Sequence, residues 1–133
     1  MRDYQRFKNN KYYLPKAVYH QTLWFIRDYQ RMKERLDEML VESSSADGMP
    51  KGSATGDPTM ARVMKRENLL KKTLVIESAI AKIPEEYRKG VWNSVMYNRA
   101  YPLDADRTTY ARYKSKFISQ VALEMGFVHE KDL

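Results

Sequence analysis

The sequence predicts an all-α protein, a long helical hairpin with a C-terminal helix-turn-helix-like helical pair. Three observations lead to this fold class. Apolar residues recur at three- and four-residue spacing through most of the chain. Glycine and proline gather between the periodic stretches, and no segment shows the alternating pattern of a β-strand. The 133 residues suit one compact domain overall.

The first helix is expected from Tyr12 to Glu42, within an N-terminal unit of residues 1–46. Pro15 suits its first turn, because the N–H that proline lacks would have no helical partner there. Trp24 is expected to anchor the core. The stretch from Arg27 to Glu38 is dense in mixed charge, which indicates either a solvated face or a partner surface. The apolar positions are Leu14, Val18, Phe25, Tyr29, Met32, Leu36, Met39 and Leu40.

Residues 47–58 are expected to form a flexible linker or loop, because many of them favour turns. The stretch from Gly52 to Gly56 is not a phosphate-binding loop, since it lacks the Gly-Lys-Ser/Thr ending and no strand precedes it. The turn formers follow directly on Ser43-Ser44-Ser45 and are Gly48, Pro50, Gly52, Gly56 and Pro58.

Residues 59–133 are expected to form the remaining helices. Thr59 is a candidate N-cap for the first of them, since its hydroxyl can accept a hydrogen bond from a free backbone N–H. A seam with alternating spacings of four and three residues runs along that helix, as in a coiled coil: Leu69, Thr73, Ile76, Ile80 and Ile83. The seam predicts packing against the first helix, as an antiparallel hairpin, or against a second copy of the chain.

The last two helices are expected over Glu85–Asn98 and from Asp106 to Met125. The carboxylate of Asp106 can cap the second of these, and Gly126 suits its C-cap. Trp92 is expected to anchor the core from the first. The apolar spine of the last helix is Tyr110, Tyr113, Phe117, Val121 and Met125.

The residue inventory excludes several kinds of site. There is no cysteine, so disulfides, cysteine-based metal sites and cysteine nucleophiles are absent. His20 and His129 are far apart, and neither has a neighbour at metal-ligand spacing. We therefore expect no enzyme, no cofactor and no metal.

The sequence also bears on location. No apolar run approaches the roughly 18 residues that a membrane span needs. The first eleven residues are charged and aromatic and lack the apolar core of a signal peptide. We expect a protein of the cytoplasm with no membrane partner.

The net charge of +7 favours polyanions, and the last helix concentrates the basic signal. Between Arg107 and Leu123 there are four basic residues and no acidic one. With the apolar spine against the core, this helix would present Thr108, Ala111, Arg112, Ser115 and Ser119. Such a face fits either a DNA-recognition helix or an ordinary amphipathic helix with a basic outer side. The candidate DNA-binding residues are Arg107, Thr108, Thr109, Arg112, Lys114, Ser115 and Lys116, with Arg88 and Lys89 as contacts to the DNA backbone.

Several short motifs resemble those of known regulators. Asp-x-x-Thr-Tyr-x-Arg at Asp106–Arg112 resembles the opening of recognition helices in sigma-factor region-4-like helix-turn-helix domains. The stretches Tyr110–Ile118 and Val121–Gly126 resemble the C-terminal part of small phage and prophage regulators of the RinA/ArpU type, and the segment Asp47–Thr59 resembles their linker. The resemblance covers roughly residues 47–128. It implies a transcription regulator in the bacterial cytoplasm.

One feature departs from the helix-turn-helix pattern. Only Arg99–Ala105 separates the last two helices, and Tyr101-Pro102 interrupts even that stretch. A short positioning helix has no room there, so Glu85–Asn98 would have to take that part.

The resulting hypothesis is sequence-specific binding of double-stranded DNA by a homo-oligomer, with the host RNA polymerase as a further partner. Two half-sites would give a small module its specificity. The alternative is a non-enzymatic phage assembly or packaging adaptor that acts through helix–helix contacts. Solution mass with and without DNA distinguishes the two.

Overall fold

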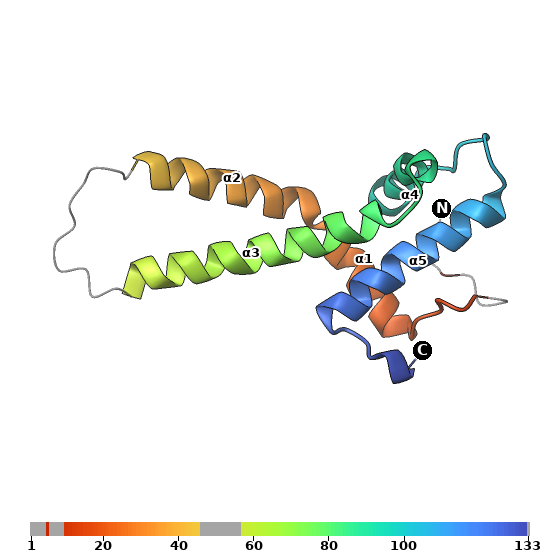
Figure 1. The fold of residues 1–133 in the computed structure, drawn as a ribbon, viewed down its shortest axis with the longest axis horizontal. Helices are drawn as coiled ribbons and strands as arrows, with labels where there is room; N and C mark the ends of the chain where they lie inside the picture. Colours follow the sequence, from red (N-terminus) through yellow and green to blue (C-terminus); the bar gives the residue numbers. More distant parts are fainter. Residues whose placement is uncertain (1–4, 6–9, 46–56, 133) are drawn as a thin grey trace.

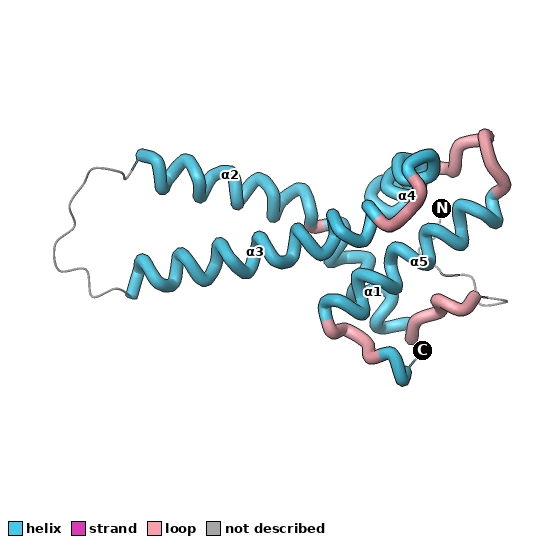
Figure 2. The backbone as a smooth tube through the Cα atoms, viewed as in Figure 1, coloured by secondary structure: helices cyan, strands magenta, loops and turns pink. Residues whose placement is uncertain are grey.

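The protein is all-α in a computed structural model that describes residues 5, 10–45 and 57–132 (Figure 1). None of these residues lies in a strand (Figure 2), which confirms the prediction of an all-α protein. The helices are α1 (Lys16–Arg27), α2 (Tyr29–Ser45), α3 (Asp57–Ala81), α4 (Glu85–Tyr97) and α5 (Arg107–Met125), with a short 3-10 helix η1 (Glu130–Asp132).

The helices form two parts, which we call the head and the stalk. The head contains α1, α4, α5 and the C-terminal part of α3, which contact one another. The stalk consists of α2 and the N-terminal part of α3, which pack side by side and extend away from the head (Figure 1). The predicted linker at residues 47–58 lies almost wholly outside the described residues. At its edges, α2 continues to Ser45 and α3 already begins at Asp57.

The prediction of a single helix over Tyr12–Glu42 is wrong, because the helix is interrupted at Asp28. The backbone N–H of Asp28 bonds to Phe25 in a tighter turn than the α-helix uses. On one side of the break, the Arg27 Nε donates to the carbonyl of Val95 in α4 at 2.8 Å. On the other side, Arg31 makes two hydrogen bonds of 2.6 Å to the Asp28 carboxylate. The break lets α1 pack in the head while α2 leaves along α3.

The core of the head is built by residues from four helices. Ile26 of α1, Ile76 of α3, Val95 of α4 and Phe117 of α5 are all fully buried. Burying such side chains contributes about 1.5–3 kcal/mol each. Ile76 and Phe117 were among the apolar positions predicted from helical spacing. Ile26 was not, and Leu40, which was, is 47% exposed.

The predicted α3 seam packs within the molecule. Thr73, Ile76 and Ile83 are buried, and Leu69 and Ile80 pack half-buried against the core. These contacts select the intramolecular alternative for this seam.

The two tryptophans behave differently. Trp92 packs in the core region and meets the ring of Tyr29 edge-on, with centroids 5.2 Å apart. Trp24, expected as a core anchor, is 62% exposed. That prediction is wrong because the neighbouring Leu23 and Ile26 occupy the inward positions of α1, while the Arg27 guanidinium lies 5.3 Å from the Trp24 ring.

Two of the three helix caps differ from expectation. Thr59 lies inside α3, two residues after its start at Asp57, so it is not an N-cap. Asp106 holds the N-cap position of α5, but its carboxylate makes no capping hydrogen bond. Gly126 is the C-cap of α5 with φ of +75°, in the left-handed region that glycine adopts without strain. The glycine cap was therefore predicted correctly.

Candidate nucleic-acid interface

Helices α4 and α5 pack against each other and are joined by the turn of residues 98–106. Helix α4 ends at Asn98, which adopts the left-handed conformation with φ of 54°. The backbone N–H of Asn98 donates to Ser94 and that of Arg99 donates to Asn93, which satisfies the last carbonyls of the helix. The turn therefore starts from a defined geometry.

A cluster of tyrosines fastens this turn to both helices. The ring of Tyr101 stacks on that of Tyr110, with centroids 5.2 Å apart and planes at 10°. Tyr87 of α4 meets Tyr110 edge-on and stacks on Tyr113 of α5. Such pairs contribute about 0.5–1.5 kcal/mol each beyond their buried area. The cluster holds the first turns of α5 against α4 and the turn.

The centre of the cluster is Tyr110, which is fully buried. Its hydroxyl donates a hydrogen bond of 2.6 Å to the carboxylate of Asp104 in the turn. Burial, together with this bond to a carboxylate, raises the pKa of Tyr110 to about 12. The phenol therefore keeps its proton to a higher pH than an ordinary tyrosine does, and it holds Asp104 close to the start of α5.

Gly90 of α4 lets the cluster close. A Cβ at this position would lie 2.6 Å from Cε1 of Tyr110 and 2.8 Å from Cδ of Pro102. Both distances are shorter than van der Waals contact allows. Only glycine permits this approach of the turn and α5 to α4.

The first half of α5 presents basic and hydroxyl side chains to solvent. Arg107, Thr108 and Arg112 are exposed, and Lys116 is half-buried. Thr108, Arg112 and Lys116 follow at intervals of four residues, which places them along one side of the helix. The structure therefore brings together the main predicted DNA contacts on one face.

Three further predicted contacts on α5 are, like Lys116, only partly accessible. Thr109, Lys114 and Ser115 are half-buried. The Ser115 hydroxyl accepts a hydrogen bond of 3.4 Å from Nδ2 of Asn10, which places the chain before α1 against this part of α5. Ser115 is thus partly covered by another segment of the protein.

The expectation that Ser119 points outward is wrong, because it is only 2% exposed. Helix α5 contacts α1 and α3 as well as α4. Its middle turns are therefore enclosed on more than one side, and the exposed basic residues Arg107 and Arg112 lie in its first half.

The two residues expected to contact the DNA backbone from α4 differ in their surroundings. The Arg88 guanidinium donates to the carbonyls of Ile83 at 2.6 Å and Ala81 at 2.7 Å. These are C-terminal carbonyls of α3 and the segment after it, which lack helical partners. Lys89 is exposed. Arg88 therefore joins α3 to α4, while Lys89 remains a surface cation.

Two exposed cations in segments that contact or precede α5 were not selected from the sequence. Arg99 lies in the turn, with its guanidinium 5.2 Å from the ring of Tyr97. Lys11 is exposed and directly follows Asn10, the residue that bonds to Ser115. The proline-interrupted stretch around Arg99 was interpreted only as a break, and Lys11 is separated from α5 by about a hundred residues of sequence.

The described part of the chain contains no group of three or more potential metal-ligating side chains. None of its helices combines the length and apolarity needed to cross a bilayer. Comparisons of the chain with protein-family models, with curated proteins and with solved structures found no significant match.

Proposed function

We propose that the protein binds double-stranded DNA in a sequence-specific manner, with α5 as the recognition helix. The observation that carries this proposal is the exposed, basic first half of α5, fixed in the head by the tyrosine cluster. Because the helix is already rigid before DNA binds, less conformational entropy is lost when the interface forms. A positively charged face with short hydroxyl side chains suits phosphates and base edges.

Within this proposal, the side chains of the face have different tasks. Arg112, exposed at the centre of the face, can make two hydrogen bonds to a guanine edge. Lys116 and Arg107 on either side reach phosphates, and Thr108 can donate to a phosphate oxygen. Lys89 from α4 adds a further backbone contact.

The wider role that we propose is that of a phage or prophage transcription regulator of the RinA/ArpU type. The motif resemblance at the start of α5 and the positive net charge support it. The protein would act in the bacterial cytoplasm as a homo-oligomer, with the host RNA polymerase as a further partner. Two copies would read two half-sites.

The decisive experiment is binding to a fragment library of the source genome at two salt concentrations. The wild type is compared with Arg112→Ala/Lys116→Ala and with Arg62→Ala/Lys65→Ala, a control pair of equal charge change that is exposed on the stalk. We expect selective, salt-sensitive binding to a few fragments, lost only in the α5 variant. Equal binding by all three proteins would rule out α5 as the recognition helix.

The second candidate function is that of an assembly or packaging adaptor, and it is favoured by exposed apolar side chains on the stalk. An adaptor of this kind would form large assemblies without DNA and bind DNA weakly, with no preference among fragments. Light scattering with and without DNA distinguishes the two functions. An adaptor should form large assemblies without DNA, whereas a regulator should have a small, fixed mass.

A further inference from the structure

The stalk carries an unusual share of exposed apolar side chains. Of ten large hydrophobic residues that are exposed in the described ranges, seven lie on α2 and α3: Leu40, Val41, Met60, Val63, Met64, Leu70 and Leu74. A concentration of large exposed apolar side chains on one part of a protein often marks an interaction site.

The exposed residues of α3 follow a second coiled-coil pattern. Alternating spacings of three and four residues connect an exposed stripe of Met60, Val63, Glu67, Leu70 and Leu74. This stripe is separate from the seam that packs inside the molecule through Ile76 and its neighbours. Helix α3 therefore has two faces that suit helix packing, of which one is satisfied within the chain.

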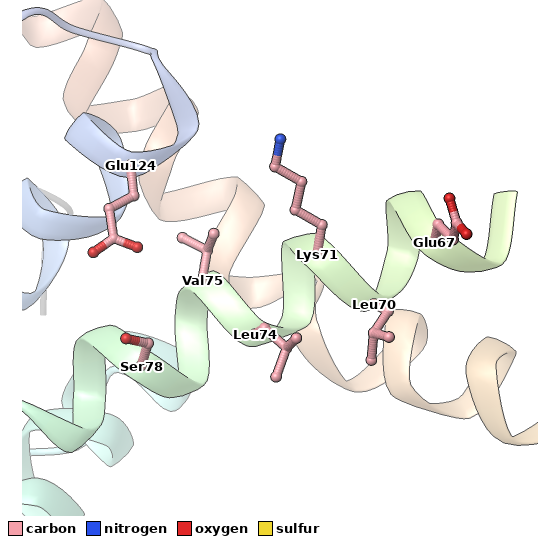
Figure 3. Close-up of a pocket in the computed structure, with 7 residues that line it drawn as sticks. All are labelled: Glu67, Leu70, Lys71, Leu74, Val75, Ser78 and Glu124. Carbon is pink, nitrogen blue, oxygen red and sulfur yellow. The ribbon is translucent and has the colours of Figure 1, made fainter. Parts of the chain in front are cut away.

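The stripe leads into a groove of about 440 Å³. Figure 3 shows Leu70 and Leu74 on one side of α3 and Lys71 and Val75 on the other, with Glu124 of α5 near its end. The carboxylate of Glu124 is paired with Lys82 at 3.3 Å. The groove is therefore apolar along its length and carries charge at its edges.

We propose that this stripe binds the same stripe of a second copy, with the two α3 helices antiparallel. The charges determine the direction. In a parallel pair, Glu67 would face Glu67 of the other copy at an inward position, and like charges there repel. In an antiparallel pair centred near Leu69, Glu67 of each copy lies opposite Lys71 of the other, which forms two ion pairs related by the two-fold axis.

The same register matches the apolar residues. Met64, the neighbour of Val63 in the stripe, comes opposite Leu74 of the other copy, and the two Leu70 side chains meet near the axis. Methionine adapts its shape to irregular grooves, so Met60 and Met64 suit the groove beside Leu74. The two heads lie at opposite ends of the stalk pair, which leaves both α5 faces accessible.

This inference specifies the self-association within the proposed function and makes no use of DNA. The first test is therefore mass by sedimentation equilibrium without DNA. We expect the wild type at twice the chain mass of 15.8 kDa. The variant Leu70→Gln/Leu74→Gln should weaken the dimer by roughly 30-fold or more, since both leucines lose apolar burial in both copies. Leu103→Gln, at a fully exposed leucine outside the stalk, should leave the dimer unchanged.

The register is tested by reversing charges. Glu67→Lys and Lys71→Glu should each weaken the homodimer by roughly tenfold, because like charges then face each other twice. A mixture of these two variants should restore a dimer, because the two positive positions of one chain then lie opposite the two negative positions of the other. Both residues are exposed in the wild type, so circular dichroism should show unchanged helix content.

A wild type that stays at the single-chain mass at about 100 µM would overturn the proposal. A dimer that is insensitive to Leu70→Gln/Leu74→Gln would do the same. A mixture of the two charge-reversed variants that fails to associate, beside a wild type that dimerises, would overturn the antiparallel register. A wild type that dimerises as proposed but binds no DNA fragment selectively would count against the recognition role of α5 and would leave the dimer proposal intact.

Discussion

The hydroxyl of Tyr110 donates a hydrogen bond of 2.6 Å to the carboxylate of Asp104. Tyr110 lies in the first turns of α5 and is fully buried, whereas Asp104 belongs to the exposed turn that precedes the helix. This bond ties the turn to the tyrosine cluster between α4 and α5. The position of the basic face therefore depends on a buried contact a few residues away from it.

Replacing Tyr110 by phenylalanine should remove this bond and keep the ring stacking. We expect the free energy of unfolding to fall by about 1 kcal/mol, the usual contribution of one hydrogen bond, with more if the Asp104 carboxylate is left poorly solvated. Urea denaturation measures the change. Tyr97→Phe, on an exposed ring of α4, is the matched control and should change stability little. Equal free energies of unfolding for Tyr110→Phe and the wild type would show that the hydrogen bond to Asp104 does not contribute to stability.

The same contact predicts a loss of stability at alkaline pH. The folded-state pKa of Tyr110 is raised to about 12 from an ordinary value of 10.0. The contribution of protonated Tyr110 to the free energy of unfolding is complete below pH 10. It is lost as the pH rises to about 12, because the tyrosine of the unfolded chain releases its proton first. The raised pKa of Tyr29, also about 12, adds to this loss. Urea midpoints measured across this range should fall less steeply for Tyr110→Phe than for wild type. Parallel curves would contradict the assignment.

Gly90→Ala should destabilise the protein although alanine is the better helix former. The added Cβ would lie 2.6 Å from Tyr110 and 2.8 Å from Pro102, so the cluster must open. We expect a net loss of about 1–3 kcal/mol from overpacking. Thermal unfolding measures it. At Gly126 no atom lies within 4 Å of an added Cβ, so Gly126→Ala should lower the free energy of unfolding by only about 1 kcal/mol, through its positive φ. A stabilised Gly90→Ala would refute the close approach.

Much of the fold follows from local pattern. The spacing of Leu69, Thr73 and Ile76 identified the inner face of α3, because tertiary burial repeats with the helical period. Gly126 marked the end of α5, because a left-handed cap favours glycine. Such features depend on a few neighbouring residues and can be found without the structure.

Other features depend on contacts between distant segments. The break at Asp28 is accompanied by the bond from Arg27 to Val95 on another helix, and nothing in the local sequence distinguishes it from a continuous charged helix. Trp24 is exposed because its neighbours took the inward positions. Ser119 is buried because α5 meets three helices. On the candidate interface, the exposed positions of Arg107 and Arg112 were predicted from charge and helical spacing. The burial of Ser119 was missed because it depends on packing against distant helices.

Arg88 should contribute to stability through its geometry as well as its charge. Its Nε and Nη2 bond to Ile83 and Ala81, and a lysine cannot reproduce this planar fork. We expect Arg88→Lys to lower the free energy of unfolding by about 1–2 kcal/mol. Lys89→Ala, at the exposed neighbour, should have an effect close to zero. A DNA titration with folded Arg88→Lys should retain most of the wild-type affinity. Full stability with lost affinity would instead assign Arg88 to the DNA.

Arg112→Ala tests the proposed contact with bases most directly. Arg112 is exposed at the centre of the α5 face, so its removal should not unfold the protein. If it bonds a guanine edge, the preferred fragment should lose about 1–3 kcal/mol of binding free energy, while unrelated fragments lose much less. Lys116→Ala should weaken all fragments alike and reduce the salt dependence, as loss of a phosphate contact does. Fluorescence anisotropy at two salt concentrations separates these effects, with Arg62→Ala on the stalk as the control. If Arg112→Ala and Arg62→Ala change binding equally, the selectivity does not come from this face of α5.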